Sequence, residues 1–378
     1  MFGITEPEAA EGAPPEVARK LGALRELLDR RGLPAVALCG TDGVAWVTGG
    51  LTNRIESGSP ASAAWVVVTP GSADVVTTNV ELPRLAAEAA LEGFGLHGVD
   101  WFDPGGFAGA VERLAGVEAA RVGGLGVDVD DDLVELRLPL GPEEQDRLAA
   151  LARDAVAALE GAVRSWRPGE LDVEVQARVA AGLEAVGAFG ACLFVGGDDR
   201  VERFRHPLPG GHAVHRLVMA VVVAERHGLH VAATRFASAG PLPAPVRAAR
   251  AKAAEVERAV LEATRAGATY GDVMEALAAA YAGVGRPGEW RDHYQGGPIG
   301  YRQREFEPVP SQEGSRWLPT AISTGTAIAW NPSVAGGGKC EDTFLVGDAG
   351  LQWLTDGGDW PLEDGRPAVL DVETGGAA

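Results

Sequence analysis

Side chains that can move protons or bind charged groups lie in the second half of this chain. His206 lies in a Pro-containing loop, and Glu341 begins an acidic Glu-Asp-Thr segment. Arg304 follows a glycine-rich run, Gly296 to Gly300. An imidazole titrates near neutral pH and can carry a proton to a reacting nitrogen. A carboxylate binds cations and a guanidinium binds carboxylates, so these residue types predict acid–base chemistry on a small charged molecule.

The order of these landmarks resembles that of one known family. His206 precedes a predicted strand pair that ends in Thr234-Arg235, and the glycine-rich run, Asn331-Pro332 and Glu341 follow. Methionine aminopeptidases, proline-specific aminopeptidases and creatinase are similar in this order, over roughly the last three-fifths of the chain. The resemblance implies an α+β fold, in which a C-terminal catalytic domain of the pita-bread type follows a smaller α/β domain.

The same resemblance locates the metal ligands of the family's peptidases. Two Asp, one His and two Glu hold a pair of divalent ions in those enzymes. Here Val221, Ala232, Gly297 and Asn331 take four of these places, and only Glu341 is a ligand type. Two adjacent dications need several carboxylates to balance four positive charges. We therefore expect no metal and no other cofactor.

Other histidine pairs are poor replacements for these ligands. His227 and His230 fall in the predicted hairpin, where residues three apart face opposite sides of the sheet. His212 and His215 fall in a Pro/Gly-rich loop. Their spacing alone is a weak indication of a metal site, and a solvated loop is the favoured interpretation.

The resemblance also implies roles for single side chains. Creatinase works without a metal and uses a His as acid and base, and His206 takes that place. The structural alternative is a His that only hydrogen-bonds to its own loop. Glu341 is expected to bind the cationic part of a substrate or to form an internal ion pair with Arg304 or Arg235. Arg304 replaces a family His and is expected to bind a substrate carboxylate.

Further side chains are expected around the pocket. Alternation along an extended chain would place Arg302 on the same face as Arg304, and Arg235 is expected to orient the cleft. Creatinase-like enzymes are homodimers whose N-terminal domain reaches the partner's site, which implies such a contact for Arg54, with a solvated loop arginine as the alternative. The other predicted substrate-binding residues are His293, Tyr301, Glu305 and Asn331.

Composition restricts the partners and the location. The 378 residues carry a formal charge of −20, which repels nucleic acid and anionic membranes. No apolar run is long enough for a membrane-spanning helix, and the acidic N-terminus is unlike a signal peptide. The three cysteines are far apart, which favours free thiols in a reducing compartment. We expect a cytoplasmic protein with a small-molecule substrate.

Apolar spacing and turn residues predict the elements. We expect a tail over residues 1–13, the N-terminal domain over 14–139 and the catalytic domain over 140–378. The N-terminal predictions include strands over Ala35–Leu38, Val44–Thr48 and Arg121–Val127. The C-terminal predictions include helices over Pro142–Ser165, Val173–Ala185, Pro245–Ala266 and Tyr270–Ala282, and a hairpin over Val218–Phe236.

The leading functional hypothesis is a metal-independent, creatinase-like enzyme. It would hydrolyse a C–N bond of a small zwitterionic metabolite of the guanidino, amidine or amino-acid type. One alternative is a lyase or rearrangement enzyme, because a His base can also remove a proton beside a carbonyl. Another is an inactive metallopeptidase homologue that acts as a binding protein. Peptidase activity through a metal-bound hydroxide is not expected, because the ligands are missing.

Overall fold

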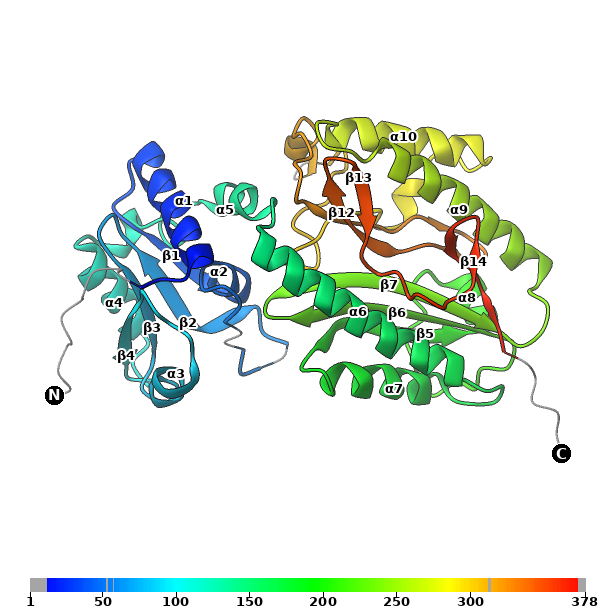
Figure 1. The fold of residues 1–378 in the computed structure, drawn as a ribbon, viewed down its shortest axis with the longest axis horizontal. Helices are drawn as coiled ribbons and strands as arrows, with labels where there is room; N and C mark the ends of the chain where they lie inside the picture. Colours follow the sequence, from blue (N-terminus) through cyan, green and yellow to red (C-terminus); the bar gives the residue numbers. More distant parts are fainter. Residues whose placement is uncertain (1–11, 52–53, 57, 312–313, 373–378) are drawn as a thin grey trace. The chain divides into compact units, whose positions relative to one another are not determined.

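The computed structural model describes residues 12–51, 54–56, 58–311 and 314–372. The tail predicted over residues 1–13 lies almost entirely outside this range. The chain forms two compact units, Met1–Arg137 and Leu138–Ala378, and each mixes helices with sheets (Figure 1). None of the helices in the described residues is long and apolar enough to cross a bilayer.

The N-terminal unit is built on one four-stranded sheet. The strand order is β1-β2-β3-β4, antiparallel except for the parallel pair β3–β4. Val67 and Val76 of this sheet share an apolar core with Val111 of helix α4. The elements are α1 Pro15–Arg31, β1 Val36–Gly40, α2 Thr41–Val47, β2 Ala61–Val68, β3 Ala73–Thr78, α3 Leu82–Glu88, β4 Gly95–Val99, α4 Gly106–Ala115, η1 Ala119–Arg121 and α5 Asp130–Arg137.

Two strand predictions in this unit are wrong. The segment Val44–Thr48 belongs mostly to helix α2, in which Val44, Trp46 and Val47 are all buried. Consecutive burial is not possible on a strand with one solvated face, so packing overrides the β-propensity of these residues. The segment Arg121–Val127 forms only isolated bridges through Gly123, after the short helix η1.

The C-terminal unit holds two four-stranded sheets. One has the order β16-β7-β6-β5 and the other β13-β12-β9-β8. The strands are β5 Phe189–Gly197, β6 Leu217–Arg226, β7 Leu229–Ser238, β8 Gly296–Pro298, β9 Ala327–Trp330, β12 Asp342–Gly347, β13 Gly350–Trp353 and β16 Leu370–Asp371. Two short hairpins accompany them, β10 Ser333–Val334 with β11 Gly338–Lys339, and β14 Leu362–Glu363 with β15 Arg366–Pro367.

Two helix pairs enclose these sheets. Helices α6 and α7 lie on one side and α9 and α10 on the other (Figure 1). Helix α6 begins with Pro142 at its first turn and buries Leu148, Leu151 and Leu159 along one stripe, as its spacing predicts. The predicted helices of this unit and the β6–β7 hairpin are confirmed. The helices are α6 Pro142–Ser165, α7 Asp172–Glu184, α8 Asp199–Arg203, α9 Ala244–Ala263, α10 Tyr270–Gly283, η2 Glu289–Asp292 and η3 Gly314–Trp317.

The two sheets are joined where β7 meets β12. The backbone N–H of Ala232 donates to Thr343 Oγ1 at 2.8 Å, and Thr343 Oγ1 donates back to the Ala232 carbonyl at 2.9 Å. The N–H of Thr234 donates to the carbonyl of Glu341 at 3.0 Å. These bonds hold Glu341 beside β7 and so determine which side chains can meet at the junction.

Candidate active site

A glycine turn brings a lysine into the centre of the junction. Strands β10 and β11 pair Ser333 with Lys339, and the turn between them contains Gly336 and Gly337 at φ values of 98° and 96°. L-residues with side chains rarely adopt such angles. The tight turn therefore folds the chain back so that Lys339 lies close to Asn331.

Lys339 is a buried cation with two oxygen partners. Its side-chain ammonium donates to Asn331 Oδ1 and lies 3.5 Å from Glu341 Oε2. Lys339, Asn331 and Glu341 are only 3%, 6% and 4% exposed. Burial lowers the pKa of Lys339, and the nearby carboxylate of Glu341 opposes this effect. The positive charge of the site is therefore carried by the chain itself.

Glu341 makes an internal ion pair, but its partner is Lys339 and not Arg304 or Arg235, the two predicted partners. Its Oε2 atom faces Lys339 and also accepts a hydrogen bond from Thr234 Oγ1 at 2.8 Å. Arg304 and Arg235, the two predicted partners, have other carboxylate partners. The Glu341 carboxylate is thus occupied by protein groups on two sides.

Two imidazoles lie beside this charged centre. The ring centroids of His206 and His293 are 4.9 Å apart, and Phe194 and Tyr294 flank His206 at 5.3 and 6.4 Å. His206 is exposed as a whole, but partial burial of its ring and the charge of Lys339 lower its pKa. His206 is therefore a neutral proton acceptor at neutral pH.

His293 is the more enclosed of the two imidazoles. Its Nε2 atom is buried and makes no hydrogen bond with any described residue. Burial, then the charge of Lys339, lowers the pKa of His293 to about 2. The structure thus brings together His206, His293, Asn331 and Glu341 of the predicted set.

Folding stability should depend on pH through His293. The folded chain keeps this imidazole neutral, whereas the unfolded chain protonates it near its ordinary pKa of 6.5. The stability it contributes is complete above that value and is lost as pH falls toward the folded pKa. His293→Gln should reduce the pH dependence of the unfolding free energy by about 1.4 kcal/mol per pH unit between about pH 6 and 4. Urea unfolding at several pH values measures this.

The exposed loop residue His215 offers the matched control for that measurement. His215→Gln should keep the pH dependence of the unmodified protein. Parallel curves for His293→Gln and the unmodified protein would contradict the assignment.

Arg304 and Glu307 form a second charged pair near the junction. Arg304 Nε lies 3.1 Å from Glu307 Oε1, and its Nη1 donates to the Ala329 carbonyl at 3.0 Å. Arg304 Nη2 makes no hydrogen bond with the described part of the chain, and Glu307 Oε2 is buried without a partner there. Burial raises the pKa of Glu307, against the effect of Arg304. Each member of the pair therefore keeps one atom for a ligand.

The neighbouring predicted residues lie in a folded loop. Residues 299–308 contain no strand, so the alternation expected for Arg302 and Arg304 does not apply. Glu305 Oε1 accepts from the backbone N–H groups of Tyr301 and Arg302 at 2.8 and 3.2 Å. The Tyr301 hydroxyl donates to Glu144 of α6 at 2.7 Å. Glu305 thus stabilises the fold of the loop, and Tyr301 connects the loop to α6.

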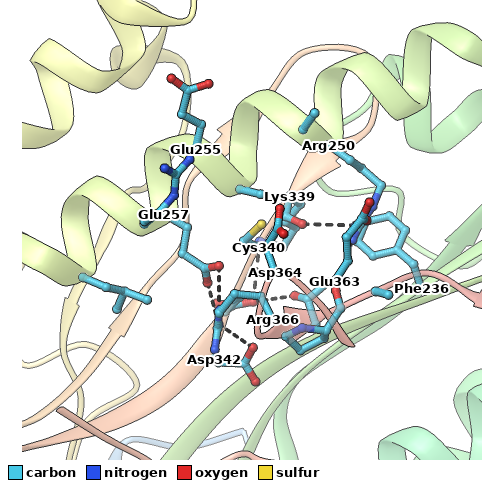
Figure 2. Close-up of a pocket in the computed structure, with 18 of the residues that line it drawn as sticks. Phe236, Arg250, Glu255, Glu257, Lys339, Cys340, Asp342, Glu363, Asp364 and Arg366 are labelled. Atoms are coloured by element: carbon cyan, nitrogen blue, oxygen red, sulfur yellow. Dashed lines mark hydrogen bonds and ion pairs between the residues drawn. The ribbon is translucent and has the colours of Figure 1, made fainter. Parts of the chain in front are cut away.

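Arg235 belongs to an ion-pair network on the other side of β7. It is 1% exposed and contacts Glu160 at 2.8 Å and Asp342 at 3.0 Å. Asp342 also accepts from Arg366 at 2.8 Å, and Arg366 pairs with Glu257 at 2.6 Å (Figure 2). Adjacent strand residues face opposite sides, so Glu341 meets Thr234 on one side and Asp342 meets Arg235 on the other.

Arg54 lies in the N-terminal unit. Its Nη2 atom is 3.5 Å from Thr41 Oγ1 of helix α2. The predicted contact with a partner subunit stays a prediction.

The residues at the family's metal positions do not fit a pair of divalent ions. Val221 and Ala232 are buried and carry no donor atom for a metal, and Gly297 has no side chain. The ammonium of Lys339 lies against Asn331 and Glu341, where a metal would need free oxygen atoms. Among the described residues, no three His, Cys, Asp or Glu side chains are grouped to hold an ion.

The sequence analysis missed Lys339, Glu307 and Cys192. Cys192 of β5 is half-buried, and burial and the charge of Glu341 raise its pKa. The sequence did contain one indication that Lys339 is a site residue. The chain has 33 Lys and Arg residues, and only Lys20, Lys252 and Lys339 are lysines. A lysine between two motif positions in such a chain is unusual.

No family model and no curated protein sequence matches the chain. Solved structures do. Dipeptidase PepE from Mycobacterium ulcerans is 20% identical, with a TM-score of 0.73 over 95% of this chain and 98% of that one. The prolidase from Pyrococcus horikoshii OT3 is 19% identical, with a TM-score of 0.70 over 89% and 98%. The N-terminal domain of FACT complex subunit SPT16 from Cicer arietinum is 13% identical, with a TM-score of 0.64 over 91% and 97%.

These structures establish the fold. The chain shares the α+β, pita-bread fold of the prolidases and dipeptidases, as the sequence resemblance predicted. Neighbours with this fold include both named peptidases and a subunit of the FACT complex. The function must therefore be argued from the side chains of the site.

Proposed function

We propose that this chain is a metal-independent hydrolase that cleaves a C–N bond in a small zwitterionic molecule. One observation carries the proposal. The ammonium of Lys339 lies between Asn331 and Glu341, and the two imidazoles of His206 and His293 lie beside it. The named dipeptidase and prolidase with this fold support hydrolysis as the reaction type. The substrate class follows from the charged pair Arg304–Glu307.

His206 would move the protons of this reaction. Its neutral imidazole takes a proton from water, and the resulting hydroxide adds to the substrate carbon. The protonated imidazole then gives the proton to the leaving nitrogen as the C–N bond breaks. Burial, and then the charge of Lys339, lowers the pKa of His206, so its imidazole is neutral before this cycle begins.

The Arg304–Glu307 pair would hold the two charges of a zwitterion. The free Nη2 of Arg304 suits a substrate carboxylate, and the unpaired Oε2 of Glu307 suits a guanidinium, amidinium or ammonium group. Glu341 was the predicted cation-binding residue, but Lys339 and Thr234 occupy its carboxylate. We therefore assign the cationic end of the substrate to Glu307.

A second candidate is elimination or rearrangement on the same site. The neutral imidazole of His206 can accept a proton from a carbon beside a carbonyl as well as from water. The two reactions differ in the source of oxygen. Turnover in ¹⁸O-labelled water places the label in the product of hydrolysis and leaves the product of elimination unlabelled.

Activity should survive chelation. A panel of guanidino and cyclic amidine amino acids is assayed by mass spectrometry before and after dialysis against EDTA, and the metal content of the protein is measured by elemental analysis. We expect equal turnover in both samples and far less than one metal per chain, because Val221, Ala232 and Gly297 carry no donor side chain and Lys339 occupies the oxygen atoms of Asn331 and Glu341. Loss of turnover on dialysis, restored by Mn²⁺, Co²⁺ or Zn²⁺, would overturn metal independence.

The panel also tests the third possibility, a binding protein without activity. Absence of turnover on every compound of the panel would favour that role. The homodimer with an N-terminal domain near the partner's site and the cytoplasmic location remain part of the proposal. Light scattering of the purified chain tests the dimer.

A further inference from the structure

A cavity of about 940 Å³ lies between helix α9, the strands β7 and β12, and the hairpin β14–β15 (Figure 2). No histidine is among the described residues that line it, but Thr234, Lys339 and Glu341 of the candidate active site are, so the cavity adjoins that site. Cavities of several hundred cubic ångströms typically hold small organic ligands. Its apolar lining residues include Phe236, Leu242, Ala251, Ala254, Leu261 and Val369.

Arg250 of helix α9 is the first of two guanidinium groups in this cavity that can still donate hydrogen bonds to a ligand. It lies over the ring of Phe236 at 4.2 Å. Its only hydrogen bonds with described residues are two long ones, of 3.4 Å, to the carbonyls of Lys339 and Pro367. It makes no ion pair within that part of the chain, whereas buried guanidinium groups are normally paired with carboxylates.

Arg366 of strand β15 is the second such group. Two of its nitrogen atoms bond to Glu257 and Asp342, but its Nη1 atom is buried without a partner among the described residues. Figure 2 shows Arg250 and Arg366 on two different walls, with the thiol of Cys340 between the segments that carry them. A buried N–H group without an acceptor is energetically unfavourable, and a ligand oxygen that accepts from it would remove this penalty.

The charge of the lining restricts the ligand. Seven basic and seven acidic residues line the cavity, so it has no excess charge to neutralise a polyanion such as phosphate. A single negative charge suits the unpaired guanidinium of Arg250. We propose that this cavity is a second ligand site, which binds a small monocarboxylate with an apolar body through Arg250 and Arg366.

The site is linked to the candidate active site by one strand segment. All four residues from Lys339 to Asp342 line the cavity, and Lys339 and Glu341 also belong to the candidate active site. Arg250 Nη1 donates to the backbone carbonyl of Lys339. A carboxylate that binds Arg250 competes for this donor, so the ligand would regulate activity, a consequence that rests on the proposed function.

Binding is tested by calorimetry on the full chain, without any assay of turnover. Benzoate is the probe, acetate tests the carboxylate without an apolar body, and inorganic phosphate tests a polyanion. We expect benzoate to bind, acetate to bind more weakly and phosphate not to bind. Arg250→Met should weaken benzoate binding at least about tenfold. Lys252→Met, on the same helix but not among the residues that line the cavity, should change it by less than about twofold.

Cys340 provides a readout at the cavity itself. Benzoate should slow the reaction of Cys340 with N-ethylmaleimide, followed by peptide mass spectrometry, and should leave Cys39 and Cys192 unaffected. Ala251→Trp fills the cavity from an exposed helix position and should abolish benzoate binding in a folded protein. Absence of benzoate binding to the unmodified chain, or equal losses in Arg250→Met and Lys252→Met, would overturn the proposal. These outcomes are independent of whether the chain hydrolyses any compound of the panel.

Discussion

His206→Ala should lower kcat on the substrate found in the panel by about 10²–10⁴-fold, the usual contribution of a general acid–base group. KM should change little, because the assigned substrate contacts are those of Arg304 and Glu307. The His206 ring makes aromatic contacts at the site but no hydrogen bond with the described residues, so the variant should fold. Steady-state kinetics and a thermal melt measure the two effects.

The pH profile separates a chemical role of His206 from a structural one. Because its pKa is lowered, the acid limb of kcat should lie below the ordinary range of histidine. His215→Ala, in the exposed loop, should leave both kcat and the profile unchanged. If His206→Ala retains full kcat with the same acid limb, His206 is not the proton carrier.

Arg235→Met should destabilise the fold by about 3–5 kcal/mol, because it leaves Glu160 and Asp342 buried without their shared cation. Methionine fills a similar volume, so packing changes little. Burial already raises the pKa of Glu160, and the loss of Arg235 would add to this penalty. Urea unfolding measures the change in the free energy of unfolding.

Arg250→Met is the matched control, since it removes a second enclosed guanidinium on the same face. Arg250 has no ion pair with the described residues and only two hydrogen bonds of 3.4 Å. Its removal leaves no buried carboxylate without a cation and should lower the free energy of unfolding by less than about 1 kcal/mol. Similar losses for the two variants would show that side-chain volume, and not the ion-pair network, determines the stability of this region.

Local pattern was sufficient for the four long helices of the C-terminal unit and for the main hairpin. The Pro at the start of α6 and the apolar stripe of Leu148 and Leu151 define that helix without help from tertiary structure. The β6–β7 hairpin follows from its two apolar runs around His227-Gly228. Helix α2 was missed because valine and tryptophan favour strands, and only the surrounding core shows that all of them are buried.

The candidate site was only partly predictable for a different reason. The order of the motifs identified His206, Asn331 and Glu341 as site residues, but it assigns each position separately and does not show which side chains contact each other. The partner of Glu341 depends on the turn between β10 and β11 and on the junction of two sheets, which no linear pattern encodes. Lys339 was therefore absent from the prediction although it is the nearest cation.

The lysine at the junction has a consequence for how the protein matures. Its charge is covalently part of the chain, so it is in place as soon as the two strands of the glycine turn have paired. No delivery protein has to load it, no abundant ion can be inserted in error, and scarcity of trace elements in the surroundings cannot deplete it. Under the proposed metal-independent mechanism, this centre is therefore complete once the chain has folded.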